Sequence, residues 1–362
     1  MDDLIGDFDF DAQTEAFDYA TKEGWRDFVD LSLVQPLRIS MAEYESLDSS
    51  DRAIYNLGRE RFRTVGARIS TPSLRNAATA IRSAMSDNRS PDASKSGVII
   101  SGRPHLGKTT AVQEFARAFE RARRRHDAGA MPSRIPVAYV PVPTHATAKT
   151  MIRQLADFYA VVYSQTASYD TLLTRVSHVM RECATELVII DDIHRLDLHY
   201  SKNEQVADAL KELSERCPGT MVYAGVDVAR NGLFWGPRGE QILARFELVR
   251  FDPFELAKGR EAEWGSLLLD LEDSLCLLNQ PPGAIKTAAR ELHDLSRGSI
   301  GRLAKALRRG AREAVERRTE QVDLDDVLKY LARLRDAEAW VDEEKMVNGS
   351  KPRRGRPAKV LQ

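Results

Sequence analysis

The feature that most constrains this chain is a glycine-rich motif that ends in a lysine and a threonine. It reads Gly102-Arg103-Pro104-His105-Leu106-Gly107-Lys108-Thr109 and matches G-x-x-x-x-G-K-[ST] at every fixed position. Gly102 and Gly107 let the backbone bend so that amide N–H groups surround phosphate oxygens. A short apolar run over 97–101 precedes the motif, and a helical pattern of apolar residues follows it. The sequence therefore predicts a strand, a phosphate-binding loop and a helix.

The same motif predicts a nucleotide and a metal ion. Lys108 would reach the β- and γ-phosphates, and the Thr109 hydroxyl would ligate Mg²⁺. The N-terminus of the following helix adds the positive end of a helix dipole. We therefore expect ATP and Mg²⁺ as cofactors. The motif residues expected to bind them are Gly102, Arg103, Pro104, His105, Leu106, Gly107, Lys108, Thr109 and Thr110.

Two adjacent aspartates supply the expected partner of this loop. Asp191 and Asp192 directly follow the apolar run 187–190, which reads as a buried strand. In open α/β sheets ligands bind at the carboxyl ends of such strands. Asp191 would hold Mg²⁺ directly or through water, and Asp192 could orient or deprotonate an attacking water. The sequence thus predicts ATP hydrolysis with Lys108 and Asp192 among the catalytic residues.

Apolar runs that alternate with helical patterns predict an α/β fold with a mostly parallel sheet flanked by helices. From about Phe254 the pattern becomes all-helical, so we expect a smaller all-α lid after a boundary near Asp252-Pro253. The expected strands are 97–101, 135–142, 187–190, 221–225 and 246–251, and the expected late helices are 285–295, 303–315 and 322–334. The expected divisions are a disordered acidic tail (1–20), a helical extension (21–90), a nucleotide-binding domain (91–252), a helical lid (253–338), and a linker with a basic tail (339–362).

The charge of the chain is distributed unevenly. The sequence has 53 Lys+Arg and 54 Asp+Glu, a formal net charge of −1, which by itself argues against a nucleic-acid partner. However, residues 1–20 carry acids and no Lys or Arg, whereas residues 349–362 carry bases and no acid. The acidic end is either a solvated tail or a docking peptide that uses Phe8, Phe10 and Phe17.

Composition excludes several other classes of protein. No apolar run approaches the length that spans a bilayer, so no membrane partner is expected. The three cysteines are scattered, form no metal-spacing pair and indicate a reducing compartment. The start Met1-Asp2-Asp3 lacks the basic residues of a secretory leader. We therefore expect a cytoplasmic protein.

The basic tail has a more specific pattern. Its glycine and two prolines exclude helix and strand and leave an extended strip of arginines, a shape that fits an A·T-rich minor groove. The segment resembles an AT-hook, whose core Arg-Gly-Arg-Pro is matched by Arg354 to Pro357; a generic basic tail is the alternative. The candidate DNA-binding residues are Arg353, Arg354, Gly355, Arg356, Pro357 and Lys359.

Together the nucleotide motifs resemble those of the AAA+ ATPases, over about residues 60–335. This resemblance implies that Arg245, at the end of Gln241-Ile242-Leu243-Ala244-Arg245-Phe246, is an arginine finger acting on a neighbouring subunit's γ-phosphate. The alternatives are a surface Arg245 paired with Glu240 or Glu247, and Arg238 as the finger. The resemblance also implies that Arg302, in the lid, reaches back to the γ-phosphate.

Two positions depart from the AAA+ pattern. Asp192 stands where the family usually has Glu, which implies slow hydrolysis or a nucleotide-timed switch. Val226 stands where the family usually has Thr or Asn, and Asp227 is the candidate substitute.

Within that class, the stretches Leu187 to Leu196 and Tyr223 to Asp227 resemble the TniB/TnsC group of transposition ATPases. The resemblance implies an ATP-bound homo-oligomer, a ring or a helical filament, that coats duplex DNA and recruits or activates a transposase. DNA contacts of this kind go to phosphates and are sensitive to salt. A replication initiator or helicase loader is one alternative, and a nucleotide-dependent signalling switch without DNA binding is another.

Overall fold

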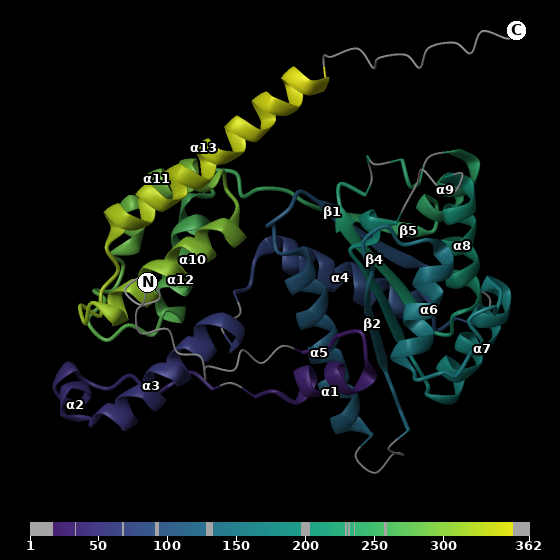
Figure 1. Ribbon diagram of the computed structural model, residues 1–362, viewed down its shortest axis with the longest axis horizontal. Coiled ribbons are helices and arrows are strands. Elements are labelled where there is room, and N and C mark those ends of the chain that lie inside the picture. Colours follow the sequence, from purple (N-terminus) through teal and green to yellow (C-terminus); the bar gives the residue numbers. More distant parts are fainter. Residues whose placement is uncertain are drawn as a thin grey trace, which may run out of the picture. The chain divides into compact units, whose positions relative to one another are not determined.

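The computed structural model describes residues 17–32, 34–66, 69–90, 94–127, 133–196, 203–228, 230, 232–234, 236–256 and 259–349. The chain divides into two compact units (Figure 1). One comprises Met1–Val34 and Arg68–Asp252, and the other comprises Gln35–Ala67 and Pro253–Gln362. The helical extension expected over 21–90 is therefore not one body, because its middle part belongs with the C-terminal helices.

Within the described residues, the first unit is built on a five-stranded sheet in the order β2-β3-β4-β1-β5. All of its neighbouring strands pair in parallel, which confirms the α/β expectation. The strands are β1 (Gly97–Gly102), β2 (Val137–Pro141), β3 (Leu187–Asp191), β4 (Thr220–Val226) and β5 (Phe246–Phe251), each within two residues of its predicted bounds. Their apolar runs, such as Leu187 to Ile190 with no exposed surface, form the core between the helical layers.

Helices cover both faces of this sheet. In Figure 1, α1, α4 and α5 lie on one side of the strands, and α6, α7 and α8 lie on the other. The bounds are α1 (Lys22–Asp30), α4 (Pro72–Asp87), α5 (Lys108–His126), α6 (Ala148–Phe158), α7 (Tyr169–Glu182), η3 (Ile193–Arg195), α8 (Asn203–Arg216) and α9 (Gly236–Leu243). No helix was predicted over α6 and α7. Both helices are amphipathic and begin at capping residues, Thr147 and Ser168.

The second unit is helical throughout its described elements. Its helices are α2 (Met41–Ser46), α3 (Ser49–Arg61), η2 (Phe62–Gly66), α10 (Glu261–Ser274), η4 (Ile285–Ala288), α11 (Ala289–Ser296), α12 (Ile300–Glu316) and α13 (Leu324–Gly349). The last four form the C-terminal helical lid that the sequence indicated. Asp323 caps α13, since its carboxylate accepts the Asp326 amide at 3.2 Å.

Helix α13 corrects one expectation. Residues 339–349 were expected to belong to the linker, but the helix continues through them to Gly349. The segment contains no proline and is rich in Glu, Lys and Met, which are good helix formers, so the helix has no local reason to stop. The acidic residues 1–16 and the basic residues 350–362 lie outside the described residues.

Candidate functional site

The phosphate-binding motif connects the end of β1 to the start of α5, as the sequence predicted. Gly107 has a φ of +84°, a backbone conformation that glycine adopts without strain. Gly102 also meets a steric requirement that the motif does not contain. It pairs with Phe251 in β5, and a Cβ on Gly102 would lie 2.2 Å from the Phe251 carbonyl oxygen. The first glycine thus permits close strand packing, and the second shapes the loop.

The N-terminus of α5 is left without a side-chain cap. Helices α4, α6 and α7 begin with Thr71, Thr147 and Ser168, whose hydroxyls each accept a first-turn amide at 3.1 Å. At α5 the N-cap is Gly107, which has no side chain, and the first turn carries no acid. A Cβ on Gly107 would meet no atom within 4 Å, so the space beside the loop is open. Amides at an uncapped, open helix N-terminus are suited to phosphate oxygens.

Lys108 is buried at the first position of α5, and its ammonium donates to the Arg103 carbonyl at 2.6 Å. Burial lowers the pKa of Lys108, while the charges of Asp191, Asp227 and Asp192 act in the opposite direction. The structure therefore gathers one ammonium and three carboxylates at the carboxyl ends of β1, β3 and β4. An excess of negative charge of this kind is suited to a divalent cation.

Asp191 ends β3 and is almost fully buried. Its Oδ1 accepts the Asp192 amide at 2.8 Å, and its Oδ2 accepts the Tyr139 hydroxyl at 2.7 Å. Burial raises the pKa of Asp191, and hydrogen bonds from Tyr139, the Asp192 amide and the Thr109 hydroxyl oppose that shift. The structure thus brings Thr109 and Asp191 together, which fits their expected role as the two protein groups at a Mg²⁺ ion that also takes phosphate oxygens and water.

Asp192 is held beside the site by a local ion pair. Its backbone is left-handed, with φ +57°, and begins the short helix η3. Its carboxylate lies 3.0 Å from the Arg195 guanidinium and 4.0 Å from His194 Nδ1. His194 Nδ1 accepts the Val226 amide at 3.2 Å, so this histidine links η3 to the end of β4. Burial lowers the pKa of His194, which favours the neutral ring.

Asp227, the candidate substitute at the position after β4, is also part of this cluster. Its amide donates to the Gly102 carbonyl at 3.2 Å, and its backbone is left-handed at φ +45°. Its negative charge favours the charged form of Lys108 and so acts to raise the pKa of that residue. Val226 contributes only its backbone at this position, through the hydrogen bond to His194.

Sequence reasoning missed Tyr139, Gln113 and Trp25. Tyr139 lies in β2, where the Val-rich apolar run identified it only as a strand residue. Gln113 of α5 donates to its hydroxyl at 3.1 Å, and the Trp25 ring of α1 stacks on it at 5.2 Å. A buried tyrosine in a strand needs a partner for its hydroxyl. That rule signals that a partner exists, but it does not say which residue provides it.

Arg245 and Arg302, the two arginines expected to act on the γ-phosphate, each have a hydrogen bond within their own unit. Arg245 follows α9 and pairs with Glu215 of α8 at 3.0 Å, rather than with Glu240 or Glu247. Arg302 is on α12 of the second unit, where its amide donates to Ser299 Oγ at 3.4 Å. Their action on a nucleotide remains a prediction. The side chain of Arg238 and the tail residues 350–362 are outside what the structure describes.

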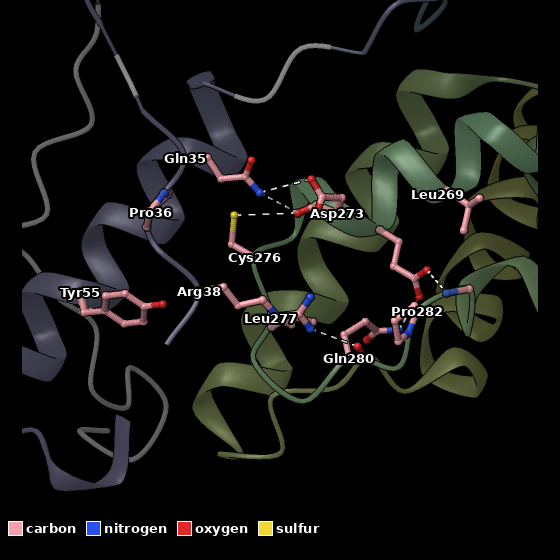
Figure 2. Close-up of a pocket in the computed structure, with 12 residues that line it drawn as sticks. Gln35, Pro36, Arg38, Tyr55, Leu269, Asp273, Cys276, Leu277, Gln280 and Pro282 are labelled. Carbon is pink, nitrogen blue, oxygen red and sulfur yellow. Dashed lines mark hydrogen bonds between the residues drawn. The ribbon is translucent and has the colours of Figure 1, made fainter. Parts of the chain in front are cut away.

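A separate cavity of about 240 Å³ lies within the second unit (Figure 2). Gln35 donates to Asp273 Oδ2 at 3.3 Å, and Arg38 donates to the Gln280 carbonyl at 3.2 Å. The buried Glu272 accepts the Gly283 amide at 2.6 Å, and Gln280 and Ile285 also donate to it. These polar groups fasten the segment around 35–38 and the loop around 280 to α10. The cavity is therefore explained by packing of the lid.

The described residues contain no group of three or more His, Cys, Asp and Glu side chains arranged to hold a metal. They also contain no helix that is both long and apolar enough to cross a membrane.

A parallel 2-3-4-1-5 sheet, a phosphate-binding loop after β1, an aspartate pair after β3 and a helical lid define the AAA+ class of ATPase folds. The family model described as bacterial TniB protein matches residues 67–256, just over half of the chain. The chain belongs to the TniB family.

Solved structures agree on the fold. Orc1 of Aeropyrum pernix, in complex with DNA, superposes with a TM-score of 0.52 at 19% identity, over 81% of this chain and 72% of that one. Orc2 of the same organism, with ADPNP and ADP, gives 0.53 at 15% identity, over 76% and 72%. Cdc6p of Pyrobaculum aerophilum gives 0.51 at 15% identity, over 73% and 68%. A comparison with curated proteins gives no significant match. At these identities the likeness concerns the fold alone.

Proposed function

We propose that this TniB-family chain is an ATP-binding regulator of DNA transposition that hydrolyses ATP with Mg²⁺. The observation that carries the nucleotide proposal is the open, uncapped N-terminus of α5, with Lys108 at its first position and Asp191 beside it. The amides of this helix end would bind the β-phosphate, and Lys108 would turn from the Arg103 carbonyl to the β- and γ-phosphates.

The residues at the site fit a hydrolytic role. Thr109 and Asp191 would hold Mg²⁺, which when bound offsets the charge on the phosphate oxygens. Asp192 would orient the attacking water or accept its proton, after its carboxylate leaves Arg195. Because Asp192 is also one methylene shorter than the usual Glu, we expect slow hydrolysis that assembly or a partner stimulates.

The DNA and protein partners belong to the same proposal. We propose that ATP-bound copies form a ring or helical filament on duplex DNA and recruit or activate a transposase, in the bacterial cytoplasm. Family membership supports this role. The basic residues 351–359 would add contacts to DNA phosphates. Arg245 would act on the γ-phosphate of a neighbouring copy, since its partner in this chain is only an exposed glutamate.

Electron microscopy of the full chain tests this proposal. The protein is imaged with duplex DNA, with and without a non-hydrolysable ATP analogue. We expect rings or filaments on DNA only when the nucleotide is present. Particles that stay monomeric with both ligands would contradict the assembly proposal and favour a signalling switch. Assembly on DNA that ignores the nucleotide would contradict the proposed ATP control.

A further inference from the structure

The buried hydroxyl of Tyr139 contacts the carboxylate that is expected to hold the metal. Tyr139 is 2% exposed and lies in β2, directly beside β3 in the sheet. Its hydroxyl lies 2.7 Å from Asp191 Oδ2, while Oδ1 accepts the Asp192 amide at 2.8 Å. Because each oxygen has a donor from a different direction, the plane of the Asp191 carboxylate is fixed. An ionised carboxylate has about four acceptor positions, so positions remain for a metal or its water.

Gln113 sets the direction of the Tyr139 hydrogen bond. The Gln113 amide nitrogen, on α5, lies 3.1 Å from the same phenolic oxygen. An amide NH₂ only donates, so the phenolic oxygen accepts from Gln113 and its own proton is directed to Asp191. The Tyr139 hydroxyl is thus a donor to the carboxylate.

The Tyr139 ring is itself held by α1. Trp25 stacks on it with an interplanar angle of 12°, and the Trp25 indole donates to Glu120 Oε2 of α5 at 2.7 Å. Arg121 of α5 donates to the Val29 and Leu31 carbonyls, each at 2.6 Å. These carbonyls are at the C-terminal end of α1, where cations are favoured. Helix α1 is therefore anchored to the same helix that begins with Lys108, and the ring has little freedom to move.

We propose that Tyr139 is a positioning residue for the metal: it orients the Asp191 carboxylate toward Mg²⁺, with Gln113 and Trp25 holding it in place. The proposal rests on the proposed ATP and Mg²⁺ site. It assigns to β2 and α1 a part in metal binding that the nucleotide motifs do not contain. Partners of this kind, behind a metal-ligating group, change metal affinity by about 10–100-fold when they are removed.

The test is the variant Tyr139→Phe, which removes only the hydroxyl. Binding of a fluorescent ATP analogue to the full chain is titrated with Mg²⁺ and repeated in EDTA. We expect Tyr139→Phe to need ~10-fold more Mg²⁺ for the same gain in nucleotide affinity. Binding in EDTA should match that of the wild type, because the phosphate-binding loop is untouched.

Tyr159→Phe is the matched control. Tyr159 is a buried tyrosine of the same unit, and its hydroxyl bonds to Thr185 at 2.7 Å instead of to a site residue. It should lose a buried hydrogen bond and keep the wild-type Mg²⁺ dependence. If Tyr139→Phe needed no more Mg²⁺ than the wild type for the same gain in nucleotide affinity, the proposal would be overturned, as it would be if Tyr159→Phe showed an equal increase. A wild-type chain that fails to bind the analogue at all would instead overturn the proposed function.

Discussion

Arg59 and Glu320 form a two-pronged ion pair in the second unit, and neither side chain is exposed to solvent. The two guanidinium nitrogens lie 2.5 Å and 2.8 Å from the two carboxylate oxygens. Arg59 also donates to the Cys276 carbonyl at 3.2 Å and lies over the Tyr55 ring, 4.9 Å from its centroid. One arginine thus fastens α3 to the loops that precede η4 and α13.

Removing one member of this pair should destabilise the second unit strongly. Arg59→Met leaves the Glu320 carboxylate buried without its partner, a change that typically costs about 3–5 kcal/mol. Unfolding in urea, monitored by protease cleavage within the lid, measures the loss in the free energy of unfolding. The double variant Arg59→Met/Glu320→Met should recover most of it, because no buried charge remains.

Arg335→Met is the matched control for this prediction. Arg335 pairs with Asp336 at 3.1 Å on the surface of α13. Exposed pairs contribute about 0–1 kcal/mol, so the unfolding curve should hardly move. If Arg59→Met were as mild as Arg335→Met, the buried ion pair would not be what holds α3 to the lid.

The Arg59–Glu320 pair could not be predicted from the sequence. Its residues are 261 positions apart, and a charged residue in a helix reads as part of a solvated surface. The same limit explains why Tyr139 was missed, since its partners come from α1, α5 and β3. By contrast, the phosphate-binding loop, the Asp191-Asp192 pair and the strands were predictable. Each of these features depends on consecutive residues: a motif of fixed spacing, an adjacent pair of aspartates, or a short continuous apolar run.

Two local features have physical reasons that the sequence patterns do not contain. Gly102 is required beside Phe251, which lies on a neighbouring strand outside the motif. The expected linker within 339–349 is helical, because its charged composition is as compatible with a helix as with a loop. Composition alone does not separate these two states.

Lys108→Ala should abolish ATP binding. The lysine is buried near three carboxylates. It is the side chain of the phosphate-binding loop that we propose contacts the β- and γ-phosphates. Isothermal titration calorimetry with ATP measures the loss. Lys211→Ala is the control: Lys211, on α8, donates to Gln241 of α9, and its removal should leave the affinity unchanged. An ATP affinity unaltered in Lys108→Ala would reject the nucleotide assignment.

Asp191→Asn should stabilise the free protein while removing its response to Mg²⁺. Burial raises the pKa of Asp191, so the charged carboxylate is disfavoured in the folded state. The protonated form of Asp191 therefore contributes to the free energy of unfolding at low pH. This contribution is lost as the pH rises through the raised pKa of the folded state. At neutral pH, Asn should add about 1 kcal/mol to the free energy of unfolding without ligand.

Thermal unfolding at neutral pH, with and without Mg²⁺-ATP, checks the Asp191 prediction. The wild type should gain stability when Mg²⁺ is added to ATP, and Asp191→Asn should not. The same scans at lower pH should bring the two ligand-free proteins closer together, as Asp191 becomes protonated. If Asp191→Asn without ligand were less stable than the wild type without ligand, the charged carboxylate would stabilise the folded state, and the prediction would be wrong.

Deleting residues 349–362 should weaken binding to duplex DNA. The slope of log affinity against log salt should fall by about one for each phosphate contact that is lost. Fluorescence anisotropy across a salt series measures both effects.

Arg354→Lys/Arg356→Lys separates the two interpretations of the tail, because lysine keeps the charge. An AT-hook should lose its A·T preference in this variant, whereas a generic basic tail should bind as before.

Arg245→Ala should slow ATP turnover while leaving ATP binding intact. The Arg245–Glu215 pair has side chains that are 39% and 45% exposed, so the arginine can leave it at little cost. Arginine fingers contribute about 10³–10⁵-fold to turnover in related phosphoryl transfers. A steady-state ATPase assay and an ATP titration separate the two effects. Glu215→Gln serves as the control, because it breaks the same ion pair and keeps the arginine, so its turnover should persist.

A mixing experiment decides whether Arg245 acts on a neighbouring copy. Asp192→Asn subunits should bind ATP, keep Arg245 and fail to hydrolyse, whereas Arg245→Ala subunits keep an intact site and lack the finger. If the finger acts between copies, a mixture should turn over ATP faster than the sum of the two variants alone, because Asp192→Asn subunits supply Arg245 to intact neighbouring sites. A mixture no faster than that sum would place the effect of Arg245 within its own chain, through Glu215 and α8.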